Sequence, residues 1–320
     1  MWKFKPIYKP TIWGGYKIAR LKRFESDERI GECWALSGID GRLSAVEGGC
    51  DDGLSIRQLI DRDGAALLGK KNFKRFGDTF PLLIKLIDAS DTLSVQVHPD
   101  DEMAQRRGLP YGKTEMWYVL PSDEEAQLTI GFNADMSREQ FLDMVASGNI
   151  ESALNRRRVA PGDVYLIPPG TVHAIGQGCF LVEIQQTSDE TYRIYDYKRR
   201  DDSGNERELH LDLALEALDF SQCDGLPVPY TARPDIPVNV VRTPYFSTNV
   251  MTIDEPILRD YSECDSFVII IATAGKAELA TGTAHAELRM GELALIPASS
   301  DNVTITPDGD FTALEVYIKQ

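Results

Sequence analysis

Residues 93–101 read LSVQVHPDD, a stretch in which polar and apolar side chains alternate. Side chains two positions apart lie on the same face of a β-strand, so Ser94, Gln96 and His98 are expected to share one face. Pro99 cannot donate a backbone hydrogen bond to a neighbouring strand and ends the pattern. The stretch therefore predicts a strand that carries three polar groups, one of them an imidazole, on a single face.

Two later stretches supply further side chains for a site. Residues 113–120 read KTEMWYVL and predict a strand with Lys113 and Glu115 on one face. Residues 162–173 read GDVYLIPPGTVH, in which the Pro-Pro-Gly turn is expected to aim His173 inward. Two histidines and a glutamate on neighbouring strands offer two nitrogens and one oxygen to a divalent metal, with room for water or substrate.

Composition and charge limit the classes of function. A chain of 320 residues can bury a sizeable core and hold one large domain and a smaller one. Hydrophobic residues make up 42% and charged residues 26%, which is typical of a soluble globular protein. The formal net charge of -16 argues against nucleic acid or an anionic membrane as the main partner. An anionic small-molecule substrate would need a local cluster of Lys and Arg.

The cysteines and apolar runs predict a cytoplasmic protein. The number of cysteines is odd and no pair has the C-x-x-C spacing, so we expect reduced thiols at all five: Cys33, Cys50, Cys179, Cys223 and Cys264. The first residues lack the apolar run of a signal peptide, and the apolar run 267–272 is too short to span a membrane. The sequence leaves the oligomeric state open.

Short strand-like runs with turn signals between them predict a mainly β fold, a sandwich or barrel, with helical insertions. Capping boxes at 55–58 and 137–140 predict helices that end near residues 61 and 148, and 211–218 also reads as a helix. The Pro- and Gly-rich stretch from residue 225 is a candidate linker. We therefore expect a metal-binding domain over residues 1–224 and a smaller β-sandwich over 225–320.

The spacing Gly162-x5-Pro168 recurs as Gly291-x5-Pro297, which indicates an internal repeat. In the second copy Asn302 stands near the place of the histidine at 173. The repeat predicts a second sandwich of the same type that binds no metal.

Several residues allow two interpretations. Lys85, inside an apolar run, is either buried at the site or reaches the surface with its ammonium. The run Arg156–Arg158 is either a phosphate patch or, as we expect, a solvated helix end. Trp13 and Trp117 either stack on a sugar ring or pack in the core, and the glycines after Trp13 indicate a turn at 13–16.

The sequence resembles the type I phosphomannose isomerases in their short bacterial form, a family of the cupin superfamily. The matching stretches follow the family's order: 13–15 (WGG), 82–88 (LLIKLID), 94–101 (SVQVHPDD), 112–118 (GKTEMWY), 168–173 (PPGTVH) and 183–196 (EIQQTSDETYRIYD). The resemblance implies a cupin-type jelly roll followed by a degenerate cupin. It also implies a zinc-dependent aldose–ketose isomerase that interconverts mannose 6-phosphate and fructose 6-phosphate through an enediol, with one zinc per chain.

The resemblance also implies roles for single residues. His98, Glu115 and His173 match the metal ligands, and Gln96 matches a fourth ligand of the longer members. Ser94 matches a position that approaches the substrate.

Catalytic roles follow from the same resemblance. Arg193 matches the catalytic arginine and is also expected to bind substrate, as is Lys113. Asp189 matches a proposed acid/base group. The longer members often carry a histidine where this chain has Gly112, so the proton-transfer base stays open between Asp189 and Lys113.

Three other interpretations remain at this point. Two histidines and one carboxylate also describe a non-haem Fe(II) oxygenase. A cupin that binds a sugar phosphate without turning it over would share the motifs. Arg193, taken alone, would form a surface salt bridge with Asp189 or Asp196.

Overall fold

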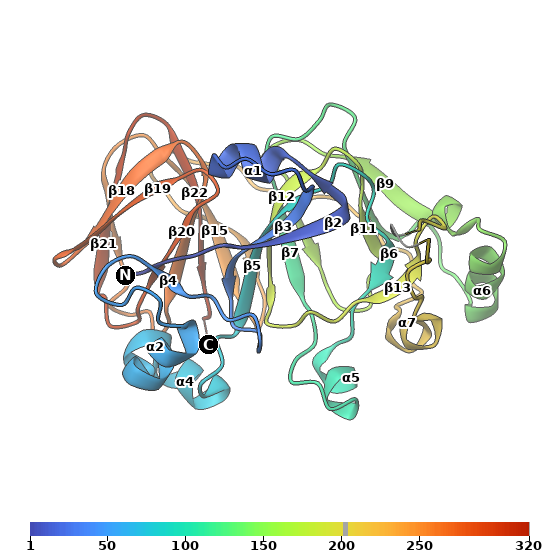
Figure 1. Ribbon diagram of the computed structural model, residues 1–320, viewed down its shortest axis with the longest axis horizontal. Helices are drawn as coiled ribbons and strands as arrows, with labels where there is room; N and C mark the ends of the chain where they lie inside the picture. Colours follow the sequence, from blue (N-terminus) through green and yellow to red (C-terminus); the bar gives the residue numbers. More distant parts are fainter. Residues whose placement is uncertain (201–203, 320) are drawn as a thin grey trace. The chain divides into compact units, whose positions relative to one another are not determined.

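The computed structural model describes residues 1–200 and 204–319, and strands dominate it, as the sequence predicts (Figure 1). A six-stranded sheet has the order β10-β7-β12-β5-β3-β2 and is built from β2 (Ile7–Gly15), β3 (Ile30–Ser37), β5 (Leu82–Asp88), β7 (Glu115–Val119), β10 (Val164–Ile167) and β12 (Phe180–Gln186). A five-stranded sheet has the order β13-β6-β11-β8-β9 and is built from β6 (Val95–Val97), β8 (Gln127–Phe132), β9 (Leu154–Arg158), β11 (His173–Ile175) and β13 (Tyr192–Tyr195).

These two sheets pack face to face across a shared core. Trp117 of β7 and Leu181 of β12 lie in one buried cluster with Leu128 and Ile130 of β8 and Ile175 of β11. Alternate residues of each strand point into this layer, which is the period-two pattern that the sequence shows. The prediction of a β-sandwich is therefore confirmed.

Helices cover the other face of the five-stranded sheet. Val95 and Val97 of β6 lie in a second buried cluster with Phe141 of α6 (Arg138–Ala146) and Ala214 of α7 (Leu211–Ala217). Figure 1 shows α6 and α7 beside β9 and β13. Because β6 is apolar on this face, its opposite face is left to carry the polar side chains at 94, 96 and 98.

A second sandwich is formed by later strands. One sheet has the order β14-β15-β22-β17-β20 and is built from β14 (Val238–Arg242), β15 (Ser247–Ile253), β17 (Val268–Ala274), β20 (Leu293–Ile296) and β22 (Phe311–Tyr317). The other has the order β16-β21-β18-β19 and is built from β16 (Ile257–Asp260), β18 (Lys276–Thr281), β19 (Ala284–Arg289) and β21 (Asn302–Pro307). Residues of both sheets, among them Ile270 and Leu279, form its core.

The remaining elements are a strand pair and short helices: β1 (Lys3–Phe4), β4 (Val46–Glu47), α1 (Lys17–Lys22), α2 (Ile56–Asp63), α3 (Ala65–Leu68), α4 (Lys70–Phe76), α5 (Asp101–Arg106) and the 3-10 turn η1 (Ile150–Ala153). Both predicted capping boxes are confirmed, at Ser55 before α2 and at Ser137 before α6. Within the described residues, no helix is both long and apolar enough to cross a membrane.

The repeated glycine turns have the same hydrogen bond in both sandwiches. The amide of Gly162 donates to the Val119 carbonyl at 2.9 Å, and that of Gly291 donates to the Ala272 carbonyl at 2.8 Å. Both glycines have a left-handed backbone, with φ of 92° and 81°. The structure thus supports the internal repeat, and Asn302 opens β21 as His173 opens β11.

Two local predictions are wrong. The glycines at 14 and 15 do not form a turn but are the last residues of β2. A Cβ on Gly14 would lie 2.5 Å from the backbone nitrogen of Gly31, so a glycine is required here for the close approach of the neighbouring strand. The run Arg156–Arg158 is not a helix end but part of β9. That strand lies at the edge of its sheet, where charged side chains are one of the features that disfavour pairing with another chain.

The chain forms two compact units, each assembled from segments that are far apart in sequence. One unit consists of Met1–Ile7, Trp34–Ile84 and Val228–Gln320, and the other of Tyr8–Cys33 and Lys85–Pro227. All of the predicted site residues belong to the second unit. The predicted division into residues 1–224 and 225–320 stays a prediction.

Candidate metal centre and active site

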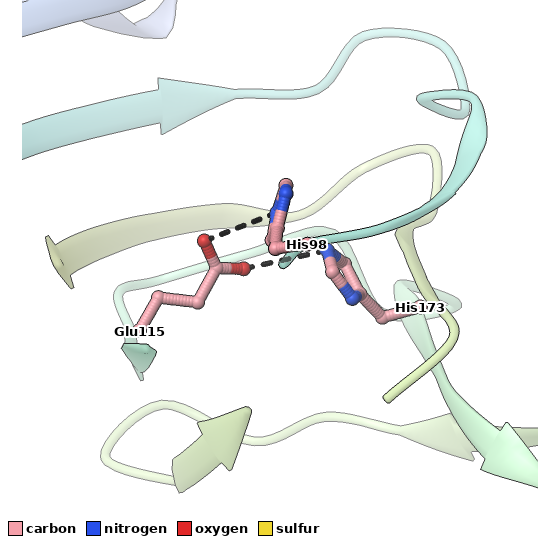
Figure 2. A group of neighbouring side chains, drawn as sticks. All are labelled: His98, Glu115 and His173. Atoms are coloured by element: carbon pink, nitrogen blue, oxygen red, sulfur yellow. Dashed lines mark ion pairs between the residues drawn. The ribbon is translucent and has the colours of Figure 1, made fainter. Parts of the chain in front are cut away.

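Three strands bring His98, Glu115 and His173 together. His98 directly follows β6, Glu115 is the first residue of β7, and His173 is the first residue of β11. β6 and β11 are paired neighbours, with His173 opposite Gln96. Figure 2 shows both imidazole rings turned toward the carboxylate of Glu115.

The ligand atoms of the three residues converge. Their nitrogens and carboxylate oxygens all lie within 4.8 Å of one another. The Nε2 atom of His98 is 3.5 Å from Oε2 of Glu115, and that of His173 is 3.4 Å from Oε1. Because Nδ1 of His173 lies 2.8 Å from the Thr171 carbonyl, which only accepts, Nδ1 carries the proton and Nε2 presents its lone pair to the site.

The buried carboxylate of Glu115 fits a metal ligand. Its side chain is fully buried, and among the described residues neither oxygen accepts a well-oriented hydrogen bond. The ammonium of Lys113 is an ion-pair partner at 3.2 Å from Oε2 and lies 3.0 Å from Nε2 of His98. Buried charges are normally paired or bound to metal. Two imidazole lone pairs and a carboxylate suit a divalent cation such as zinc.

Electrostatics favour the same interpretation. Burial raises the pKa of Glu115 to about 7, although the charge of Lys113 opposes the rise. Burial lowers the pKa of His173 to about 4, and burial and the charge of Lys113 hold the pKa of His98 well below its usual value. Both histidines are therefore neutral, which is the form that binds metal. The raised pKa of Glu115 shows that Lys113 alone does not offset the cost of burying the carboxylate, and a bound cation would.

A buried ion pair lies beside this group. Nζ of Lys85 is 2.8 Å from Oε1 of Glu183, on the neighbouring strands β5 and β12, and Nε1 of Trp117 lies 3.2 Å from Oε2. Burial would raise the pKa of Glu183, but the charges of Lys85 and Lys113 lower it to about 2. Of the two interpretations of Lys85, the structure therefore supports the buried one.

The sequence reasoning did not single out Glu183 as a site residue. The available signal was one acidic residue inside the apolar run of β12, matched by one lysine inside the apolar run of β5. Opposite charges in two buried strands are stable only if the strands are neighbours. Trp13 and Trp117 lie in the core, at 5% and 0% exposure, so neither ring has a face open to a sugar.

Arg193 lies on β13, opposite Gln96 of β6 and so beside the candidate ligands. Its Nε donates to Oγ of Ser94 at 3.3 Å, and its terminal nitrogen donates to the Glu208 carbonyl at 2.8 Å. Its backbone amide donates to Nδ1 of His210 at 3.1 Å. The side chain is thus held by neutral acceptors.

Among the described residues, Arg193 forms no salt bridge with either candidate partner, Asp189 or Asp196. Asp196, one of the two candidate partners, pairs with Arg199 and Arg207 instead. Asp189, the other candidate, lies 3.8 Å from Lys9 and is 41% exposed in its side chain. Arg193 therefore forms no ion pair with a carboxylate of the described residues, although the charges of Asp196 and Glu208 act on it.

Gln96 lies beside the cluster of His98, Glu115 and His173. Its side-chain nitrogen is 3.2 Å from Nε2 of His173, the atom that would bind metal. The oxygen and nitrogen of an amide are assigned from their hydrogen bonds, and rotation by half a turn exchanges them. Gln96 can therefore present its oxygen at the same place.

Comparison with known proteins agrees with this geometry. The family model for the catalytic domain of type I phosphomannose isomerase matches residues 1–133, and the model for the cupin domain of mannose-6-phosphate isomerase matches residues 238–317. The mannose-6-phosphate isomerase ManA of Bacillus subtilis is 34% identical over 300 residues, which is 92% of each chain. The mannose-6-phosphate isomerase of Streptococcus mutans is 33% identical over 288 residues, or 89% of each chain.

A solved structure gives the same result. The crystal structure of the mannose 6-phosphate isomerase from Bacillus subtilis matches with a TM-score of 0.87 and 31% sequence identity, over 98% of both chains. A match of this extent covers both sandwiches as well as the buried histidine and glutamate group. The chain therefore belongs to the type I phosphomannose isomerase family.

Proposed function

We propose that the protein is a zinc-dependent isomerase that interconverts D-mannose 6-phosphate and D-fructose 6-phosphate through an enediol. Relatives that are mannose-6-phosphate isomerases support mannose 6-phosphate as the substrate. The observation that carries the proposal is the convergence of two neutral imidazoles and one buried carboxylate, next to the side chains of Lys113 and Arg193.

We assign one zinc ion per chain to His98, Glu115 and His173. When bound, zinc supplies a Lewis acid that stabilises negative charge on a substrate oxygen without transfer of a proton. The fit rests on the buried Glu115 oxygens and on the fixed tautomer of His173. Gln96 is the proposed fourth ligand, through its side-chain oxygen.

Lys113 is proposed to bind substrate and to take part in proton transfer. The single lone pair on Nε2 of His98 cannot accept a hydrogen bond from Lys113 and bind a metal at the same time. Metal binding would therefore release the ammonium of Lys113 to another acceptor. A hydroxyl or developing oxyanion of the substrate is the acceptor that we propose.

Isomerisation also requires a group that moves a proton between C1 and C2 of the sugar. Asp189 is the proposed acid/base group, and it lies on the loop between β12 and β13, near Lys85. Loops at the edge of a rigid sandwich commonly carry such side chains. Lys113 is the second candidate for this role.

Arg193 and Ser94 are proposed to bind the anionic substrate. The planar guanidinium carries a permanent charge, and its bond to Ser94 fixes its direction. In a protein with a net charge of -16, a phosphorylated sugar must find positive charge locally, and Arg193 together with Lys113 provides it.

A coupled assay of fructose 6-phosphate formation from mannose 6-phosphate tests the proposal. We expect turnover by the purified protein, loss of turnover with a chelator, and recovery on addition of Zn²⁺. Oxygen uptake that depends on Fe(II), without isomerisation, would instead establish the oxygenase. Saturable binding of the sugar phosphate without turnover would establish a non-catalytic cupin.

A reducing cytoplasm is the proposed location. All five cysteines are free thiols, and two of them, Cys33 and Cys179, are buried with raised pKa values because burial disfavours the thiolate.

A further inference from the structure

Lys9 bridges two carboxylates at the side of the proposed active site. It lies on β2, and its ammonium is 3.5 Å from Oε2 of Glu32 on the neighbouring strand β3. The same ammonium is 3.8 Å from Oδ2 of Asp189. The side chains of Lys9 and Glu32 are 26% and 16% exposed, so this bridge is only partly screened by solvent.

The two carboxylates also act on the buried ion pair. Burial lowers the pKa of Lys85, but the charges of Glu183, Glu32 and Asp189 raise it above its usual value. Charges therefore alternate inward from Lys9, through Glu32 and Asp189, to Lys85 and then to Glu183. Without Lys9, Glu32 and Asp189 would lose a cation, and both would still act on Lys85, which already pairs with Glu183 at 2.8 Å.

The backbone before Asp189 is held by hydrogen bonds that do not involve Lys9. The side-chain nitrogen of Gln185 donates to the carbonyls of Gln186 and Ser188, at 2.8 and 2.5 Å. The amide of Ser188 donates to the Gln186 carbonyl at 2.7 Å. These bonds fix the chain up to residue 188, and the contact with Lys9 at 3.8 Å is one of those that hold the Asp189 side chain.

We propose that Lys9 is a positioning residue, which orients Asp189 for proton transfer and holds the loop at 187–191 in place. The inference rests on the proposed function, because Asp189 has the acid/base role only there. Lys9 itself is not proposed to touch the substrate.

Kinetics of Lys9→Met test the orienting role. We expect kcat to fall about tenfold, since a displacement of about 1 Å can cost up to a hundredfold and a partly exposed pair holds its partner incompletely. KM should stay within about twofold, because Arg193 and Lys113 are unchanged. Lys9→Arg keeps a cation in reach of both carboxylates and should retain kcat within about threefold.

A matched control is Lys17→Met. Lys17 has a similar exposure of 28% and pairs with Asp123 at 2.9 Å, in the same compact unit. Its loss should leave kcat and KM unchanged. An equal fall of kcat in Lys17→Met and Lys9→Met would overturn the specific role of Lys9.

The double variant, Lys9→Met combined with Asp189→Asn, shows whether Lys9 acts through Asp189. In the Asp189→Asn background the carboxylate that Lys9 orients is gone, so Lys9→Met should change the remaining kcat by less than about twofold. A full, multiplicative tenfold loss in that background would overturn the proposal.

Hydrogen exchange provides a readout that does not depend on activity. Amides of residues 187–191 should exchange at least about threefold faster in Lys9→Met than in the wild type or in Lys17→Met. Unchanged exchange there would overturn the inference. If the wild type shows no isomerisation, the proposed function fails, while the exchange result still decides whether Lys9 holds the loop.

Discussion

Replacement of Lys85 by methionine should strongly destabilise the protein. Lys85 and Glu183 form an ion pair at 2.8 Å with side chains only 5% and 4% exposed. Methionine nearly fills the volume of the lysine stem but leaves a carboxylate buried without its cation. Breaking a buried pair in this way costs about 3–5 kcal/mol.

The pKa of Glu183 gives a second route to this magnitude. Burial acts to raise it, yet Lys85 and Lys113 lower it from 4.5 to about 2. That difference corresponds to about 3 kcal/mol, at about 1.4 kcal/mol for each tenfold change in the protonation equilibrium. Because the folded-state pKa is the lower one, this stabilisation is fully present above the unfolded-state pKa and is lost as the pH falls toward about 2.

Urea denaturation at neutral pH, followed by circular dichroism, measures the free energy of unfolding. We expect a loss of about 3–5 kcal/mol in Lys85→Met and a similar loss in Glu183→Gln, which keeps an acceptor for Nε1 of Trp117. The double variant buries no unpaired charge and should be more stable than either single variant. Arg158→Met, which breaks the exposed pair with Glu125, should cost less than about 1 kcal/mol. Single variants within about 1 kcal/mol of the wild type, or strictly additive losses, would refute the reasoning.

Four further predictions concern the proposed site. His173→Ala should lose metal and activity together, measured by metal analysis and the coupled assay, and full zinc occupancy in this variant would exclude His173 as a ligand. Arg193→Ala should lower kcat by about two to three powers of ten with KM largely held, and Arg193→Lys should restore little; wild-type turnover in a folded, zinc-loaded Arg193→Ala would contradict this. Lys113→Met should still bind zinc, as measured by calorimetry, but should have a lower kcat. Without zinc this variant should lose more stability than with zinc, because Lys113 is the main partner of Glu115 only when no metal is bound. Zinc soaked into crystals should show no ordered ion in residues 225–320, and an ion at Asn302 or His285 would contradict the prediction.

Local patterns in the sequence predicted the elements that position the site. The alternation at 93–98 predicted β6, and the two capping boxes predicted α2 and α6. Each of these signals arises from residues within a few positions of one another, because strand alternation, turn geometry and helix capping are local interactions. The candidate ligands could be named for the same reason, since each histidine lies next to a proline-containing turn that ends or begins a strand.

Other features depend on partners that are distant in the chain. Gly14 looks like part of a turn until β3 is placed against β2, where the close approach of Gly31 requires a glycine. The charges in Arg156–Arg158 suggested a helix end, whereas their position on an edge strand gives them their exposure. Neither outcome can be read from neighbouring residues, because sheet order decides it.

The sequence by itself determined the mainly β fold, the strands that carry His98, Glu115 and His173, and the surplus of acidic residues that makes local cations necessary. Only the tertiary structure decided that Lys85 meets Glu183 and that Lys9 meets Asp189. For Lys85 and Glu183 the physical reason is that a buried charge needs a counter-charge, and for the partly exposed Lys9 and Asp189 it is that opposite charges attract across neighbouring segments. Which strands bring two such charges together depends on the packing of the whole sandwich, and no local pattern encodes that arrangement.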